Sequence, residues 1–303
     1  LSRRQRQMCI RDRFCNSQYS HADTEHICES CQHEECPQSC KKCLEEIHYP
    51  YRYPNGKKDY DCCNLIYFYM CDYTYKYASE IWYLLRKSEV IKSIETFRIL
   101  SIGCGGCPDL MAFESYLKEN GQRKKISYLG IDKNELWSPI HNEIKNYRSN
   151  LIRTSFCYDD ALELLSRKRV NSANVLVLQY VISHFYNTGQ ICKIELFYER
   201  LIENIILRKE KGKPFVILIN DVNSNNRGRD LFESLCKKLA DAGMHGSYAK
   251  YYFNYRIQND YQRYGEEHTS NSLLYDMPSN LSKYEPWKYC SSAQMIIEIS
   301  GVD

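Results

Sequence analysis

The chain has 303 residues, 43% of them hydrophobic and 26% charged, which excludes a wholly disordered protein. This length suits one large α/β domain with a small appendage, or two modest domains. The longest apolar runs, such as 175–178 and 215–219, are far too short to cross a bilayer, so we expect a cytoplasmic protein.

The first 13 residues, LSRRQRQMCIRDR, resemble translated sequencing-adapter sequence, and we predict that they are foreign to the fold. They carry five arginines and one aspartate, so the net charge of +3 becomes about −1 without them. Net charge therefore does not predict nucleic-acid binding, although a local basic patch is compatible with it. The rest divides into a cysteine-rich region (14–59), a helical segment (60–96) and an α/β domain (97–303).

Ten of the 16 cysteines lie between residues 9 and 71. Two pairs, Cys28-x-x-Cys31 and Cys40-x-x-Cys43, are spaced so that four thiolates can converge on one tetrahedral ion. Because nothing in the sequence directs export, metal binding explains clustered thiols better than disulfides do. We predict a structural zinc site at these four cysteines. The residues that it leaves unassigned are His26, His33, Cys36, Cys62, Cys63 and Cys71.

Other interpretations of the cysteines stay open. The spacing Cys36-x-x-x-Cys40-x-x-Cys43 matches that of radical S-adenosylmethionine (SAM) enzymes, in which three cysteines hold a four-iron cluster. Those enzymes resemble a partial β/α barrel after the cluster, whereas a polar, tyrosine-rich stretch follows here. An iron–sulfur cluster held by four cysteines, or free thiols, are the remaining alternatives.

Many of the 27 tyrosines lie in the stretches 49–83 and 248–289. From Tyr60 to about Ser93, tyrosines and leucines recur at spacings of three and four, which predicts one or two amphipathic helices. Their tyrosine face could pack on the sheet or lean over a cofactor.

From Arg98 onward, short apolar runs alternate with amphipathic stretches, which predicts a parallel sheet covered by helices on both faces. The predicted strands are Arg98–Ile102, Ile126–Ile131, Leu151–Phe156, Val175–Leu178, Phe215–Asn220, Lys250–Tyr255 and Gln294–Ile299. This gives a seven-stranded α/β sheet.

A glycine-rich turn follows the first predicted strand, in the sequence Gly103-Cys104-Gly105-Gly106-Cys107. Such a turn lets the backbone approach a ligand, and an acid that ends the second strand, Asp132, can accept both hydroxyls of a ribose. A G-x-G-x-x-G dinucleotide turn would need glycine at position 108, where Pro108 stands. The pattern, over about 200 residues, resembles class I SAM-dependent methyltransferases, whose G-x-G-x-G turn departs here at Cys107.

The resemblance implies a Rossmann-like sheet ending in an antiparallel hairpin, here with a long insertion that is a candidate substrate lid. It places SAM against Gly103, Cys104, Gly105, Gly106 and Asp132, with Asp160 or Asp159 at the adenine amino group and Gln179 and Tyr180 at the transfer site. His184, beside Ser183, is the candidate base. The alternatives are that Asp132 and Asp160 cap helices and that His184 is structural.

The methyl acceptor is not predicted beyond RNA, protein or a small molecule. After the fourth strand, Gln179-Tyr180-Val181-Ile182 lacks the Asn/Asp-Pro-Pro-aromatic motif of exocyclic-nitrogen methyltransferases, and the Pro-Cys pair of cytosine carbon-5 enzymes is missing too. The architecture loosely resembles ribosome-assembly methyltransferase-like proteins, and some basic clusters could meet RNA phosphates. They are Lys41-Lys42, Lys57-Lys58 and Arg123-Lys124-Lys125. A non-catalytic SAM-binding or metal-dependent interaction protein is the second hypothesis.

Overall fold

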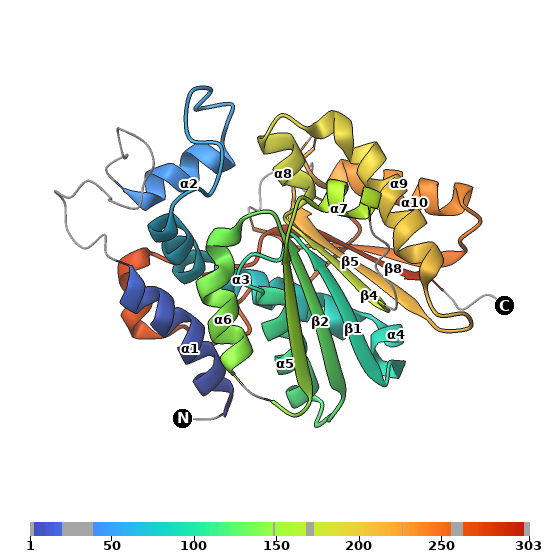
Figure 1. Cartoon of the computed structure of the whole chain (residues 1–303), viewed down its shortest axis with the longest axis horizontal. Coiled ribbons are helices and arrows are strands. Elements are labelled where there is room, and N and C mark those ends of the chain that lie inside the picture. Colours follow the sequence, from blue (N-terminus) through green and yellow to red (C-terminus); the bar gives the residue numbers. More distant parts are fainter. Residues whose placement is uncertain are drawn as a thin grey trace.

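A computed structural model describes residues 3–19, 39–147, 149–167, 173–225, 227–255 and 263–299. A mixed eight-stranded sheet forms its centre, in the order β3-β2-β1-β4-β5-β8-β6-β7 (Figure 1). The strands are β1 Thr96–Ile102, β2 Lys125–Asp132, β3 Ile152–Tyr158, β4 Val175–Gln179, β5 Phe215–Val222, β6 Gly246–Tyr252, β7 Glu266–Glu267 and β8 Ser292–Ile299. The first five strands of that order are parallel, and β8 runs antiparallel to both β5 and β6.

All seven predicted strands are present, and the antiparallel last pair is confirmed by the register of β8 with β6. The predicted count of seven was wrong by one. The additional strand, β7, consists of two exposed glutamates that pair with Tyr251 and Tyr252. Two polar residues carry no alternation of apolar side chains, so no periodic pattern could predict this strand.

Helices cover both faces of the sheet (Figure 1). The described α-helices are α1 Arg3–Gln18, α2 Cys40–His48, α3 Cys63–Lys87, α4 Glu89–Ser93, α5 Pro108–Glu119, α6 Ser138–Asn146, α7 Ala161–Arg167, α8 Ile182–Asn187, α9 Ile194–Asn204 and α10 Phe232–Asp241. Neighbouring residues of each strand point to opposite faces, so Ile99 packs in the cluster under α3 and α5, and Leu100 in the cluster under α9 and α10. The sheet therefore has a buried layer on each side. None of the described helices is long and apolar enough to cross a membrane.

The long helix α3 and the short α4 occupy the stretch for which the tyrosine and leucine spacing predicted helices. Most side chains of α3 are buried, including Leu65, Ile81 and Leu85. A helix that is apolar nearly all round belongs inside a fold, and α3 packs between the sheet, α5 and α1. It thereby becomes one wall of the space above the ends of the parallel strands.

Helix α1 includes residues that we expected to be foreign to the fold. Arg11 donates a 2.9 Å hydrogen bond to the carbonyl of Cys107, and Asp12 accepts one of 2.7 Å from the hydroxyl of Tyr75. Both side chains are buried. The division of the chain at residue 13 stays a prediction, and these contacts argue against it.

The predicted zinc site cannot be placed as a whole, because Cys28, Cys31 and Cys36, like His26 and His33, lie outside the described residues. Cys40 and Cys43 lie on the buried face of α2, and Cys62 and Cys71 are buried as well. A zinc site at Cys28, Cys31, Cys40 and Cys43 stays a prediction.

Asp72 on α3 makes the stability of the fold dependent on pH. Its Oδ1 is buried without a hydrogen-bond partner among the described residues, and burial raises its pKa from 3.8 to about 7. A carboxyl whose pKa is raised in the folded state contributes fully to stability below its ordinary pKa, where it is protonated in both states. As pH rises toward the pKa of the folded state, the unfolded chain loses its proton first, so the fold loses stability. We expect Asp72→Asn to raise the free energy of unfolding by roughly 2 kcal/mol at about pH 8, and by less at about pH 5.

Urea unfolding at the two pH values measures this difference. Asp241→Asn, at the exposed end of α10, is the matched control and should change the free energy of unfolding by at most about 0.5 kcal/mol. An equal effect of Asp72→Asn at both pH values would show that this carboxyl does not titrate as burial predicts.

Candidate active site

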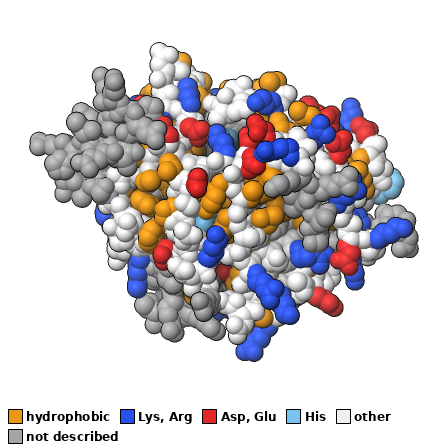
Figure 2. Space-filling view, in the orientation of Figure 1, with side chains coloured by type: hydrophobic (Ala, Val, Ile, Leu, Met, Phe, Trp, Pro, Cys, Tyr) orange, Lys and Arg blue, Asp and Glu red, His pale blue; other side chains and the backbone are white. Residues whose placement is uncertain are grey.

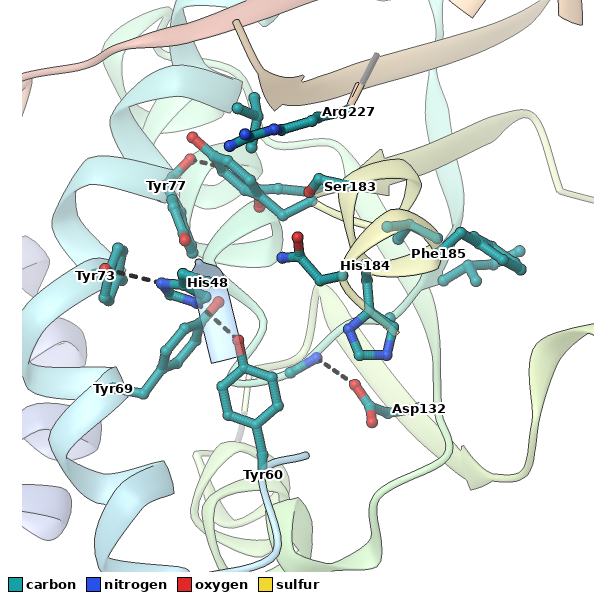
Figure 3. A pocket seen from close by; sticks show the side chains of 18 of the residues that line it. His48, Tyr60, Tyr69, Tyr73, Tyr77, Asp132, Ser183, His184, Phe185 and Arg227 are labelled. Atoms are coloured by element: carbon teal, nitrogen blue, oxygen red, sulfur yellow. Dashed lines mark hydrogen bonds between the residues drawn. The ribbon is translucent and has the colours of Figure 1, made fainter. Parts of the chain in front are cut away.

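A cavity of about 600 Å³ opens at the carboxyl ends of the parallel strands (Figure 3). Its size lies within the range of about 300–1,000 Å³ typical of small-molecule sites, and its position is the usual one for ligands of open α/β sheets. Its wall combines the glycine turn after β1, the ends of β2 and β4, helix α8 and the tyrosine face of α3. Lining residues with polar side chains include His48, Asp132, Asp159, Asp160, Gln179, Tyr180, His184 and Arg227.

The glycine turn has the backbone conformation that its sequence predicts. Gly103 and Gly105 have φ angles of +62° and +45°, which strain a residue with a Cβ. A Cβ on Gly106 would lie 1.9 Å from Sδ of Met70, so α3 can approach the turn closely because that residue is glycine. Gly103 and Gly105 line the cavity, whereas Cys104 and Gly106 are buried and are not among the lining residues.

Asp132 lies at the end of β2 with its carboxylate on the cavity wall. Its Oδ2 accepts a 2.9 Å hydrogen bond from the amide of Gly105, and its Oδ1 accepts one of 3.0 Å from the amide of Asn134. Burial raises its pKa, and these two amides oppose the rise. Each carboxylate oxygen keeps a further lone pair, so a vicinal diol could donate to both.

The two predicted adenine-side acids differ in their surroundings. Asp159 is paired with Arg167, with oxygen–nitrogen distances of 2.7 and 3.0 Å. Asp160 accepts hydrogen bonds from the amides of Leu162 and Glu163 at 2.9 and 3.1 Å, so it caps α7. Both line the cavity, and the capping alternative for Asp160 is what the geometry shows.

Gln179 and Tyr180, at the end of β4, are both tied to α3. The side-chain amide of Gln179 donates a 2.9 Å hydrogen bond to the carbonyl of Tyr77. Tyr180 has a φ of +55°, which turns its ring onto that of Tyr77, with 4.2 Å between centroids. A bulky residue in this conformation is held by its neighbours. Its hydroxyl donates a 2.9 Å hydrogen bond to Glu80 and accepts one from Lys76.

His184 projects from α8 into the cavity on the side of Asp132, as Figure 3 shows. Burial lowers the pKa of His184 most, and the nearby charge of Lys133 lowers it further. The imidazole is therefore neutral near neutral pH and able to accept a proton. The helix that carries it is anchored by Asp221, whose Oδ2 accepts hydrogen bonds from the amides of Ile182 and Ser183. The Ser183 residue is itself buried.

His48 is a cavity residue that sequence reasoning missed. Its Nε2 lies 2.9 Å from the hydroxyl of Tyr60 and its Nδ1 lies 3.2 Å from that of Tyr73. Its pKa is lowered to about 4, and burial is the largest cause. Figure 3 shows His48 and His184 on opposite sides of the cavity. No motif marks His48, because a long stretch of chain separates α2 from the turn and from α8.

Aromatic rings line the α3 side of the cavity, with Tyr69 stacked on Tyr73 at 5.0 Å and Tyr73 packed 5.2 Å from Tyr77. Their spacing of four residues places them on one face of α3. Trp287, from the insertion between β6 and β8, adds a ring 6.2 Å from Tyr73. The insertion thus contributes to the wall, and its role as a lid stays a prediction.

The sequence matches no protein-family model and no curated protein. The structure is similar to the plantazolicin methyltransferase BpumL in complex with SAH, at 14% identity and a TM-score of 0.46, covering 86% of this chain and 98% of that one. BpumL in complex with a triazolic desmethylPZN analog and SAH gives 13% identity and a TM-score of 0.47, covering 87% and 98%. The bifunctional kinase-methyltransferase WbdD is 12% identical, with a TM-score of 0.38, and the match covers 87% of this chain and 46% of that one. Similarity at this level does not identify a reaction. The proposed chemistry therefore rests on the residues of the site.

Proposed function

We propose that the protein is a SAM-dependent methyltransferase. The observation that carries the proposal is the carboxylate of Asp132, held by the amide of Gly105 on the wall of the cavity. This geometry offers acceptors for both ribose hydroxyls directly beside a turn whose backbone a ligand can approach. When bound, SAM would supply an electrophilic methyl group.

Two features favour SAM over a nicotinamide dinucleotide. Pro108 begins α5 at the position where the dinucleotide turn needs its third glycine. In addition, β8 is inserted antiparallel between β5 and β6, which is the hairpin that the sequence resemblance implies. An all-parallel 3-2-1-4-5-6 sheet would be the dinucleotide-binding arrangement.

The cavity favours an active enzyme over a non-catalytic SAM-binding protein. Gln179, Tyr180 and His184 all line it, so tyrosine side chains do not fill the space beside the expected transfer site. Methyl transfer is an in-line displacement, for which orientation of the acceptor is the main task of the protein. The rings of Tyr73, Tyr77 and Trp287 would orient an acceptor with a flat or apolar group.

RNA is not the acceptor that the surface favours. Of the basic clusters, Lys41 is paired with Glu285, and Lys57 with Asp61. Lys124 donates to the carbonyl of Lys92. The face shown in Figure 2 carries acidic and basic side chains interspersed, without one continuous basic patch. We therefore place a peptide or small-molecule acceptor ahead of RNA.

His184 would take the proton of the acceptor. We expect His184→Ala to lower methyl transfer by roughly 100-fold, in line with the loss of a general base, and to leave SAM affinity within about threefold. Transfer is measured with methyl-labelled SAM and fractionated extracts containing peptides, small molecules or RNA. The exposed His245 supplies the control variant, His245→Ala, which should transfer at the wild-type rate.

Two outcomes would contradict parts of this proposal. Full activity of His184→Ala would remove this histidine from proton transfer and make His48 the next residue to replace. No labelling of any fraction by a protein that binds SAM would favour the non-catalytic alternative.

A further inference from the structure

A group of two thiols and one imidazole lies behind the glycine turn, outside the cavity wall. The ligand atoms of Cys104, Cys107 and His141 all lie within 4.8 Å of one another, and the three residues are fully buried. The two cysteines come from the turn after β1, and the histidine comes from α6. We infer that these three residues bind one zinc ion, which fastens the turn to α6.

The separation of Cys104 and His141 is close to that of two ligands around a tetrahedral ion. With zinc–sulfur and zinc–nitrogen bonds of about 2.3 and 2.0–2.1 Å, adjacent ligand atoms lie about 3.6 Å apart. Sγ of Cys104 lies 3.9 Å from Nε2 of His141, close to that value. The carbonyl of Gly105 accepts hydrogen bonds from Nε2 of His141 at 2.7 Å and from Sγ of Cys107 at 3.7 Å. A zinc ion would take the place of the protons that these two atoms donate.

The imidazole is oriented as a metal-bound histidine would be. Its Nδ1 lies 2.9 Å from the hydroxyl of Tyr158, which can accept a proton from Nδ1 once zinc replaces the proton on Nε2. Its ring is stacked on Phe156, with 3.9 Å between centroids and 6° between planes. Two contacts of different kinds therefore fix the ring with Nε2 toward the thiols.

The turn itself keeps room for the two thiols. Cys107 has a φ of +59°, in the left-handed region where the resembled family has glycine and where a Cβ is disfavoured. On the neighbouring strand, a Cβ on Gly130 would lie 2.7 Å from Sγ of Cys104. A strained cysteine and a glycine that makes space for the other thiol are both explained if the sulfurs have a ligand.

Buried sulfur and nitrogen ligands select zinc over magnesium or calcium, which prefer oxygen. The inference goes beyond the proposed function, because it holds whether or not methyl transfer occurs. It is also independent of the predicted site at Cys28, Cys31, Cys40 and Cys43, with which it shares no ligand.

Metal content tests the inference on the full chain, purified from zinc-supplemented culture. We expect Cys107→Ser and His141→Asn each to contain one zinc equivalent fewer than the wild type. Cys290→Ser, at another fully buried thiol, is the matched control and should keep the wild-type content. In the cobalt-loaded chain, the same two variants should lose a set of thiolate charge-transfer and tetrahedral d–d bands.

Circular dichroism identifies which variants fold, and Cys104→Ser is measured in parallel in case Cys107→Ser does not. Loss of one equivalent in the folded variants, with Cys290→Ser unchanged, supports the site. Equal zinc in the wild type and in any folded variant of the three residues overturns it, as does a wild-type chain that binds no zinc.

Discussion

Asp132→Ala is expected to weaken SAM binding by roughly 100-fold, the largest effect on SAM affinity of any single substitution in the cavity. The carboxylate would accept two ribose hydroxyls, and charge-assisted hydrogen bonds contribute about 1.5–3 kcal/mol each. Its loss also frees the amide of Gly105, which Asp132 holds at 2.9 Å. Isothermal titration calorimetry of SAM into the variant measures the change.

Two further variants separate binding from folding. Asp132→Asn keeps one acceptor oxygen and should bind SAM with intermediate affinity. Asp241→Ala, on the exposed end of α10, should bind like the wild type. Wild-type affinity in a folded Asp132→Ala protein would mean that the ribose does not lie at the end of β2.

Glu80→Ala is expected to lower the free energy of unfolding by roughly 3–5 kcal/mol. Glu80 and Lys76 form a buried ion pair with 2.7 Å between Nζ and Oε1. The same carboxylate accepts hydrogen bonds from the side chain of Asn220 and the amide of Ser291, each at 3.0 Å. Alanine would leave a buried ammonium and several donors without their acceptor. Urea unfolding monitored by tryptophan fluorescence measures the loss.

A double variant tests whether the stranded charge causes the effect. Lys76→Met combined with Glu80→Gln removes both charges and keeps a side-chain oxygen for the donors, so it should recover much of the stability that Glu80→Ala loses. A Glu80→Ala protein within about 1 kcal/mol of the wild type would show that this pair is not buried as the structure has it.

The sheet and the cofactor edge could be predicted because their signals are local. Apolar runs marked the seven main strands, and a glycine turn followed by Pro108 marked the start of α5. Asp132 could be identified because parallel strands end at one edge, so an acid that ends the second strand lies beside the turn after the first. None of these inferences needs contacts between distant parts of the chain.

The rest of the candidate site depends on contacts between distant parts of the chain and could not be predicted. His48 reaches the cavity because α2 packs against α3, and Tyr180 lies on Tyr77 because Glu80 and Lys76 hold its hydroxyl. His141 belongs to an ordinary amphipathic helix, so its place behind the turn appears only when α6 is packed on the sheet. For Asp160, the sequence allowed both a cap and a ligand, and hydrogen bonds to two amides show the cap.

The measurement that tests the central claim most directly is calorimetric titration of SAM into the wild-type chain, with a nicotinamide dinucleotide titrated in parallel. The geometry of Asp132 and the glycine turn predicts one SAM per chain, a micromolar Kd, and no binding of the dinucleotide. A well-folded protein that binds no SAM, or that binds the dinucleotide in its place, would contradict the account.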